Sequence, residues 1–284
     1  MPDPGGRKIR LIGADLDNTL LNSEKKLTDY TKRVLETCME KGIVFAPATG
    51  RAKRGIPQQV RELKGLRYAL LANGAAVIDL ENDEYIYRNG ISFEKALSLV
   101  RELDRYDTYY DFFAEGAGWC EGRFFDHPEK YRIDHHIIDL VRASRKRIDS
   151  MEDWLMAHGK QVEKFTMFFA DEKLRQEVLH DLSKDSQICV TSSLSNNLEI
   201  NHFSCNKGQA LLALGSHLGI PAEEIMAFGD GYNDLEMIRM AGLGVAMENS
   251  VPELLKAADY ITSSCDQDGV GRAAASFALG MNSL

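Results

Sequence analysis

The sequence predicts an α/β protein in which a doubly wound parallel-sheet core is interrupted by an inserted α+β domain. Apolar runs of strand length alternate with amphipathic helical segments at the start of the chain, and the same alternation returns near its end. The long segment between these two halves is irregular and rich in aromatic residues. A chain of 284 residues is long for one compact domain and sufficient for two.

The first half of the core begins with a buried strand. Residues 9–14 are apolar apart from one arginine, as expected of a parallel strand that is covered on both faces. Thr28 can cap a helix over roughly residues 29–41, and the apolar runs 43–48 and 66–72 predict two further strands. This alternation predicts a parallel sheet with helices on both faces.

The pattern changes after residue 75. Residues 76–80 and 85–88 predict two short strands joined as a hairpin. The run Arg145-Lys146-Arg147 further on is typical of a solvated basic face. Mixed elements indicate an α+β insert over residues 85–194, with strands at 164–169 and 187–191 and a helix at 172–182.

The second half of the core resumes the alternation. Ser250 and Glu253 form a capping box, which predicts the start of a helix. Before and after it we expect a helix at 207–218 and strands at 225–228, 243–247 and 260–262. The predicted core is therefore discontinuous, with residues 1–84 and 195–284 on either side of the insert.

Composition narrows the classes of partner. Lys and Arg number 34 against 43 Asp and Glu, so the net charge of −9 argues against general binding to nucleic acid or to anionic membranes. No apolar run approaches the ~18 residues that a membrane span requires. The five cysteines are scattered without a C-x-x-C pair, which favours a reducing, cytoplasmic setting. We expect a monomer or a weak dimer.

Polar residues follow the predicted core strands where each strand ends. Asp15 and Asp17 follow the first strand and point the same way, because side chains two apart on an extended backbone share a face. The carboxyl ends of parallel strands meet at one edge of the sheet, where ligands bind. The other residues expected at this edge are Thr49, Gly50, Lys207, Asp230, Asn233 and Asp234.

This set of groups suits phosphoryl transfer. A carboxylate can attack phosphorus, while neutral donors and a lysine hold the phosphate oxygens. Asp15, Asp17, Asp230 and a phosphate dianion sum to about −5, of which Lys207 offsets one. A hard dication would bring the total to about −2, and oxygen ligands favour Mg²⁺ over zinc.

Other interpretations of these residues are weaker. A calcium loop starting at Asp15 fails, because Leu20 stands where glycine is required and Lys26 where a bidentate Glu is required. A dinucleotide-binding turn fails because Asp234 replaces the third glycine. Taken alone, Lys207 is typical of a solvated lysine in a first helical turn, and Asn233 or Asp234 of a helix cap. Their convergence on strand ends favours the functional interpretation.

Four segments together resemble the motifs of the haloacid dehalogenase (HAD) superfamily. The length and position of the insert resemble the cap domain of its Cof-type phosphatases, and the implied core is Rossmann-like. Two departures stand out: Asn18 occupies a usual glycine position, and residues 202–205 lack the usual proline. The segments are Asp15-Leu16-Asp17-Asn18-Thr19-Leu20, Ala48-Thr49-Gly50-Arg51, Asn206-Lys207-Gly208 and Gly229-Asp230-Gly231-Tyr232-Asn233-Asp234.

The resemblance implies a role for each matching residue. Asp15 would be the nucleophile and a Mg²⁺ ligand, and Asp17 would be the general acid and base, with its backbone carbonyl on the metal. Asp230 would complete the protein ligands, and Asp234 would orient them. The phosphate would be held by Leu16, Thr49, Gly50, Lys207 and Asn233.

We therefore predict a Mg²⁺-dependent phosphomonoester hydrolase acting on a small phosphorylated metabolite, with sugar phosphates as the expected class. A phosphomutase with the same nucleophile is one alternative. A non-enzymatic receiver-type phospho-acceptor is another, and the large insert and Asp17 argue against it. A dehalogenase would need neither Asp17 nor the metal.

Overall fold

In the computed structural model, residues 8–131 and 135–281 are described, and the chain forms two compact units. The core unit contains the chain up to Gly50, residues Ile56–Arg88, and the chain from Asn206 onwards. The insert unit contains Asn89–Cys205 together with the short stretch Arg51–Gly55. None of the described helices combines the length and apolar character needed to cross a membrane.

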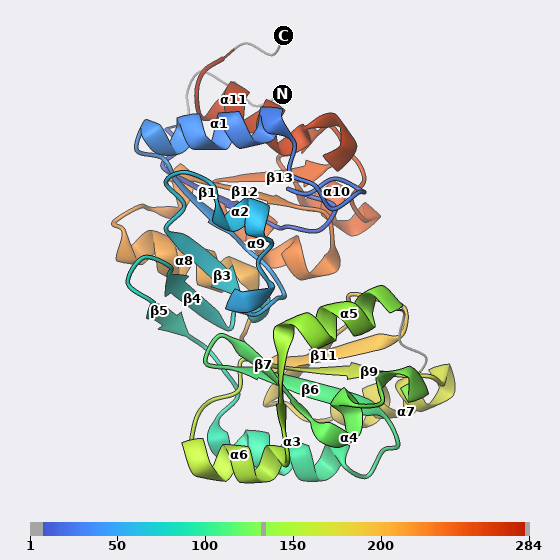
Figure 1. Ribbon diagram of the computed structural model, residues 1–284. Helices are drawn as coiled ribbons and strands as arrows, with labels where there is room; N and C mark the ends of the chain where they lie inside the picture. The colour runs from blue at the N-terminus through green and yellow to red at the C-terminus, as the bar shows by residue number, and fades with distance from the viewer. Residues whose placement is uncertain (1–7, 132–134, 282–284) are drawn as a thin grey trace. The chain divides into compact units, whose positions relative to one another are not determined.

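The core unit is built on a parallel sheet of five strands in the order β14-β13-β12-β1-β2 (Figure 1). The chain leaves β1 towards β2 on one side, and the later strands are added on the other side, next to β12. The gap between such opposite connections lies at the carboxyl end of the first strand, where α/β sheets bind ligands. The strands are β1 Leu11–Ala14, β2 Val44–Pro47, β12 Ile225–Gly229, β13 Leu243–Met247 and β14 Tyr260–Thr262.

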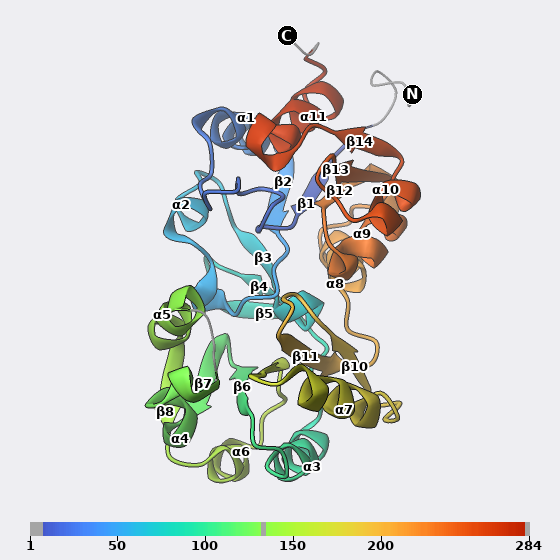
Figure 2. The ribbon, with the colours of Figure 1, turned by 90° about the vertical axis from the view of Figure 1, so that its right-hand side faces the viewer.

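Helices cover both faces of this sheet, which confirms the doubly wound prediction. Helices α1 (Asp29–Glu40) and α11 (Gly269–Phe277) lie side by side on one face, over a cluster that includes Ile12 (Figure 2). The opposite face carries Leu211 of α8. Gly13 permits this close packing, because a Cβ there would lie 2.8 Å from Cδ2 of Leu211. The helices of the second face are α8 Lys207–His217, α9 Leu235–Met240 and α10 Pro252–Ala257.

Two sequence predictions for the core differ from the structure. The third strand, β3 (Tyr68–Leu71), belongs to a separate three-stranded sheet, in which it pairs antiparallel with β4 (Ala76–Asp79) and β4 pairs with β5 (Glu84–Arg88). It runs parallel to the end of β2, which it meets at the isolated bridge between Leu70 and Ala48, and the tight turn after β3 reverses the chain into β4. The predicted hairpin over 76–88 is confirmed.

The capping box at Ser250 is also absent. Helix α10 starts after Val251 without a side-chain cap, and Ser250 Oγ instead donates to the carbonyl oxygen of Gly229 at 3.2 Å. The short helix α2 (Gln58–Arg61) completes the core elements.

The insert is an α+β unit with a six-stranded sheet in the order β10-β11-β9-β6-β7-β8, antiparallel except for β7 and β8. Its last strand along the chain, β11, pairs with β9, so residues 195–205 belong to the insert although the sequence placed them in the core. The strands are β6 Tyr109–Ala114, β7 Ala117–Glu121, β8 Arg145–Ile148, β9 Lys164–Phe168, β10 Ile188–Thr191 and β11 Asn197–His202. The helices are α3 Phe93–Leu103, α4 Gly122–Phe125, α5 His135–Ser144, α6 Met151–His158 and α7 Glu172–Leu182.

Candidate active site

Asp15 lies at the centre of the candidate site, directly after β1. Its backbone N–H donates to the carbonyl oxygen of Phe228 at 3.0 Å, and its carbonyl oxygen accepts from the N–H of Leu20 at 3.1 Å. The N–H of Leu21 donates to the carbonyl oxygen of Leu16 at 2.8 Å, so the chain folds back over itself after the strand. These bonds fix Asp15 at the sheet edge, where its side chain is buried.

Lys207, the first residue of α8, joins two acids of the site. Its Nζ lies 2.5 Å from Oδ1 of Asp15 and 2.6 Å from Oδ1 of Asp234, and it is fully buried. The Asn206 side chain caps the helix by accepting from the N–H of Gln209 at 2.8 Å. Burial disfavours an ammonium ion, but the two carboxylates outweigh it and raise the pKa of Lys207 above its ordinary value. The solvated lysine that an isolated reading of the sequence favours is therefore wrong.

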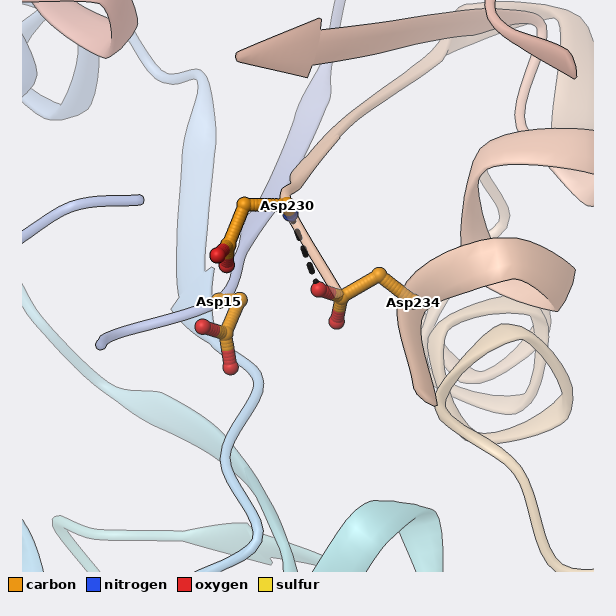
Figure 3. Close-up of side chains that lie close together, drawn as sticks. All are labelled: Asp15, Asp230 and Asp234. Carbon is orange, nitrogen blue, oxygen red and sulfur yellow. Dashed lines mark hydrogen bonds between the residues drawn. The ribbon is translucent and has the colours of Figure 1, made fainter. Parts of the chain in front are cut away.

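Asp234 connects the lysine to the end of β12. Its Oδ2 accepts from the backbone N–H groups of Asp230 and Gly231, both at 3.0 Å (Figure 3). Gly229 makes room for this side chain, because a Cβ at Gly229 would lie 2.3 Å from Cβ of Asp234. The Asp234 carboxylate thus accepts from Lys207 on one oxygen and from the loop on the other, and it does not cap α9.

Three carboxylates are close enough to share a cation. One oxygen from each of Asp15, Asp230 and Asp234 lies within 4.8 Å of the others (Figure 3). Burial, together with Asp234 and Asp230, raises the pKa of Asp15 above its usual range although Lys207 opposes the shift. Burial and Asp234 raise the pKa of Asp230 to about 6, against the hydrogen bond that Thr19 Oγ1 donates to its Oδ1 at 2.9 Å.

Burial is the first cause of both raised pKa values, and the neighbouring carboxylates add to it. A hard dication would offset the repulsion between these carboxylates, and their donor atoms are all oxygen, which suits Mg²⁺. Because both oxygens of Asp234 already accept hydrogen bonds, Asp15 and Asp230 are the carboxylates of this group best suited to ligate it.

Asp17 lies on the outer side of the same loop. Its side chain is 39% exposed, and Nζ of Lys25 lies 3.3 Å from its Oδ1. The carboxylate is near enough to Asp230 to contribute to the raised pKa of that residue. The site therefore contains a buried acid, Asp15, and a second, partly exposed acid two residues later.

Thr49 reaches the same edge from the neighbouring strand. The N–H of Ala48 donates to the carbonyl oxygen of Ala14 at 2.7 Å, which aligns the end of β2 with the end of β1. Thr49 is buried, its N–H donates to the carbonyl oxygen of Leu70 at 2.9 Å, and Gly50 follows it.

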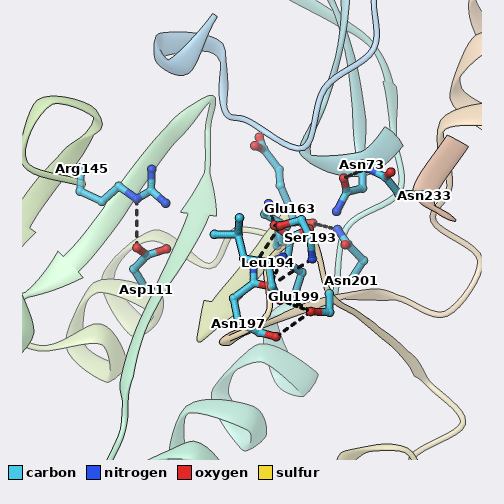
Figure 4. Close-up of polar contacts among 12 residues, drawn as sticks. Asn73, Asp111, Arg145, Glu163, Ser193, Leu194, Asn197, Glu199, Asn201 and Asn233 are labelled. Carbon is cyan, nitrogen blue, oxygen red and sulfur yellow. Dashed lines mark hydrogen bonds and ion pairs between the residues drawn. The ribbon is translucent and has the colours of Figure 1, made fainter. Parts of the chain in front are cut away.

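A second contact of the core unit was not predicted from the sequence. Asn233 Nδ2 donates to Oδ1 of Asn73 at 3.4 Å (Figure 4). Asn73 is buried and has a φ of 62°, and the next residue, Gly74, has a φ of 95°. A Cβ at Gly74 would lie 2.2 Å from the carbonyl oxygen of Asn206, so this turn packs against the start of α8. The Asn-Gly dipeptide after an apolar run was the signal available for it.

The insert contains its own buried charges. Arg145 Nε lies 3.0 Å from Oδ2 of Asp111, with both side chains buried, and Lys164 Nζ lies 2.9 Å from Oε1 of Glu199 (Figure 4). The guanidinium carbon of Arg145 also lies 4.5 Å from the centre of the Phe113 ring. The solvated basic face predicted for this run is therefore wrong for Arg145.

The chain is similar to known hydrolases along almost its whole length. Residues 12–273 match the family described as haloacid dehalogenase-like hydrolase. The sequence is 30% identical over 265 residues to the 5-amino-6-(5-phospho-D-ribitylamino)uracil phosphatase YcsE of Bacillus subtilis, covering 93% of this chain and 94% of that protein. It is 31% identical over 255 residues to the HMP-PP phosphatase of Cronobacter sakazakii, covering 87% and 86% of the two chains.

Its fold is similar to that of a haloacid dehalogenase-like hydrolase from Bacteroides thetaiotaomicron. The two structures superpose with a TM-score of 0.80 and 29% sequence identity, covering 94% of this chain and 98% of the other. Sequence and fold thus agree over both halves of the core and the insert.

Proposed function

The chain belongs to the haloacid dehalogenase-like hydrolases and is a phosphatase, and from that premise we propose that it hydrolyses phosphomonoesters through a phosphorylated Asp15. One observation carries the proposal. Lys207, fully buried, bonds both Asp15 and Asp234, and Asp234 in turn holds the loop that presents Asp230. In this arrangement the Asp15 carboxylate can attack phosphorus, while the ammonium of Lys207 offsets part of the negative charge of the phosphate.

The first step forms an aspartyl-phosphate, which is an acyl phosphate, on Asp15. An oxygen of Asp15 attacks phosphorus, the bond between phosphorus and the substrate oxygen breaks, and the leaving oxygen takes a proton from Asp17. In the second step Asp17 accepts a proton from water, and the water oxygen attacks phosphorus. The bond to Asp15 then breaks and releases inorganic phosphate. Asp15 and Asp17 both return to their starting states.

The remaining polar groups would hold the phosphate oxygens. The N–H groups of Leu16 and Gly50, the Thr49 hydroxyl, the Asn233 amide and the Lys207 ammonium supply donors for a phosphate beside Asp15. Asn73, which contacts Asn233, would hold that amide in place.

We assign the cation to Mg²⁺, held by Asp15, Asp230 and the backbone carbonyl of Asp17, with Asp234 orienting Asp230. When bound it would neutralise part of the negative charge of the acids and of the phosphate.

The proposed substrate is a small phosphorylated metabolite, with sugar phosphates as the first class to examine. Support comes from the relative YcsE, whose name describes a substrate with a phosphorylated ribityl chain. We also propose that the enzyme acts in the cytoplasm on such free metabolites.

The test is phosphate release from p-nitrophenyl phosphate and a panel of sugar phosphates, with Mg²⁺ and with a chelator. We expect turnover that requires the metal and yields inorganic phosphate. A phosphomutase would instead isomerise a sugar phosphate without releasing phosphate, and a receiver-type acceptor would not turn over. Either result from the purified wild-type protein would refute the proposal.

A further inference from the structure

The turn formed by residues 22–26, which follows the candidate catalytic loop at residues 15–20, holds a lysine in an unusual backbone conformation. Lys25 has a φ of 60°, a left-handed conformation that side chains other than those of Gly, Asn and Asp rarely adopt. The N–H of Asn22 donates to the carbonyl oxygen of Lys26 at 3.0 Å. The N–H of Lys25 donates to the carbonyl oxygen of Asn22 at 2.9 Å. Asn22 Oδ1 also accepts from the N–H groups of Glu24 and Lys26. The turn is therefore closed around Asn22, with Lys25 fixed at its tip.

Contacts from elsewhere in the core unit hold the same turn on two sides. The N–H of Ser23 donates to Oδ1 of Asp266 at 2.9 Å. Gln59 holds the other side, since its Nε2 donates to the carbonyl oxygen of Lys25 at 2.7 Å and its Oε1 accepts from the N–H of Leu27 at 3.0 Å. The backbone of Lys25 is thus bonded directly, and a strained conformation persists where its surroundings enforce it.

The side chain of Lys25 points back to the candidate catalytic loop. Its Nζ lies 3.3 Å from Oδ1 of Asp17 and donates to Oδ1 of Asn18 at 3.2 Å. The next residue, Lys26, pairs with Glu24 at 2.7 Å instead. Two adjacent, exposed lysines of one turn therefore contact different acids, and only the acid beside Lys25 belongs to the candidate catalytic loop.

An exposed ion pair contributes little to folding stability, so stability alone does not account for a strained lysine held at this place. The contact of Lys25 with Asp17 does account for this conformation. Asp17 is partly exposed, and a charge-assisted contact restricts the rotation of a carboxylate that must face the reacting oxygen.

We infer that Lys25 is a positioning residue, which orients the carboxyl group of Asp17 so that Asp17 can give its proton to the leaving oxygen. The inference rests on the proposed function, because it needs Asp17 to be the acid. It involves no new chemical step, since Lys25 keeps its proton and Asp17 exchanges one with the leaving oxygen.

The test uses two substrates that differ in their need for an acid. The alkoxide of a sugar phosphate needs a proton as it leaves, whereas p-nitrophenolate leaves without one. The quantity to compare is kcat/KM, which reports the steps up to formation of the aspartyl-phosphate. For Lys25→Met we expect a loss of about five-fold on the sugar phosphate and less than two-fold on p-nitrophenyl phosphate, given the strength of such a contact. Lys25→Arg should restore most of the loss.

The matched control is Lys26→Met, which removes a lysine from the same turn and should leave both rates at the wild-type level. Equal losses on the two substrates in Lys25→Met, or a rise in KM alone, would overturn the inference, because a lysine that binds the phosphate would act on both. The variant Asp17→Asn separates the two proposals. If kcat/KM falls selectively for the sugar phosphate in Asp17→Asn but not in Lys25→Met, the inference about Lys25 is wrong and the proposed function stands. If Asp17→Asn keeps the wild-type kcat/KM on both substrates, the proposed function is wrong.

Discussion

Nζ of Lys207 lies 2.5 Å from Oδ1 of Asp15, although 192 residues separate the two in the chain. The first acid of the core thus receives its counter-charge from the second half of the core, on the far side of the insert. Because Lys207 also bonds Asp234, this one ammonium connects the ends of β1 and β12. The contact therefore joins the two halves of the core at the candidate site.

Replacing Asp15 with Asn should abolish turnover. The amide is nearly the same size but is a poor nucleophile, so we expect kcat to fall on the order of 10³-fold or more. Phosphate release under saturating Mg²⁺ measures the effect, and circular dichroism should show an unchanged fold. Activity within ten-fold of the wild type would show that another group attacks phosphorus.

Replacing Lys207 with Met should destabilise the protein as well as inactivate it. The change leaves two buried carboxylates without their ammonium partner, which typically costs about 3–5 kcal/mol. Urea unfolding followed by fluorescence measures the loss. Lys184→Met is the control, because Lys184 pairs with Asp181 on the surface at 2.8 Å and its removal should cost less than about 1 kcal/mol. Equal midpoints for the two variants would contradict this prediction.

The raised pKa of Asp230 predicts a pH dependence of stability without metal. Its pKa of about 6 in the folded chain lies above its ordinary value of about 4, so the folded state holds this proton more tightly. The contribution of Asp230 to the free energy of unfolding is then greatest below pH 4, and it is lost as the pH rises through about 6. Asp230→Asn keeps an acceptor for Thr19 and should be about 1–3 kcal/mol more stable than the wild type at pH 7.5, with little difference at pH 4.

Excess Mg²⁺ should make the wild type more stable than Asp230→Asn, which is the reverse of the order expected without metal. Thermal unfolding in excess metal should show a higher midpoint for the wild type, because a ligand that binds only the folded state stabilises it. Asp230→Asn should respond weakly to the metal. A variant that gains as much from Mg²⁺ as the wild type would remove Asp230 from the ligands.

In the insert, Arg145→Met should destabilise far more than Arg147→Met. Both arginines belong to β8, but Arg145 pairs with Asp111 in the interior, whereas Arg147 pairs with Asp126 at the surface. Losing the buried pair typically costs about 3–5 kcal/mol, and losing the exposed pair less than about 1. Urea unfolding of the full chain provides the comparison, and similar midpoints would show that Asp111 is not left unpaired by the change.

The sequence predicted the parallel core well because its strands are buried on both faces. A continuous apolar run followed by acids, as at Asp15 and Asp230, indicates both a strand and the position where it ends.

The failures of the sequence analysis have different physical causes. The run at β3 is as apolar as a parallel strand and does meet Ala48 in a parallel bridge, but the turn at Asn73 and Gly74 adds an antiparallel partner, β4, that the sequence did not indicate. Arg145 and Arg147 are two apart on one strand, and their different burial follows from their partners, which are the buried Asp111 for Arg145 and Asp126 at the surface for Arg147. The contact of Lys25 with Asp17 depends on a left-handed backbone that no local pattern of residues indicates.

The order of strands in the core sheet also determines when the protein can become an enzyme. Strand β1 pairs with β2 on one side but with β12 on the other, where Leu11 is aligned with Ile225. During synthesis the insert, whose residues are nearly contiguous, can fold while β1 still lacks one neighbour. Closing that gap brings together residues far apart in sequence, which is the slow kind of contact in folding. Asp15 is therefore made long before Lys207, and it acquires this neighbour only once the second half of the core has been made.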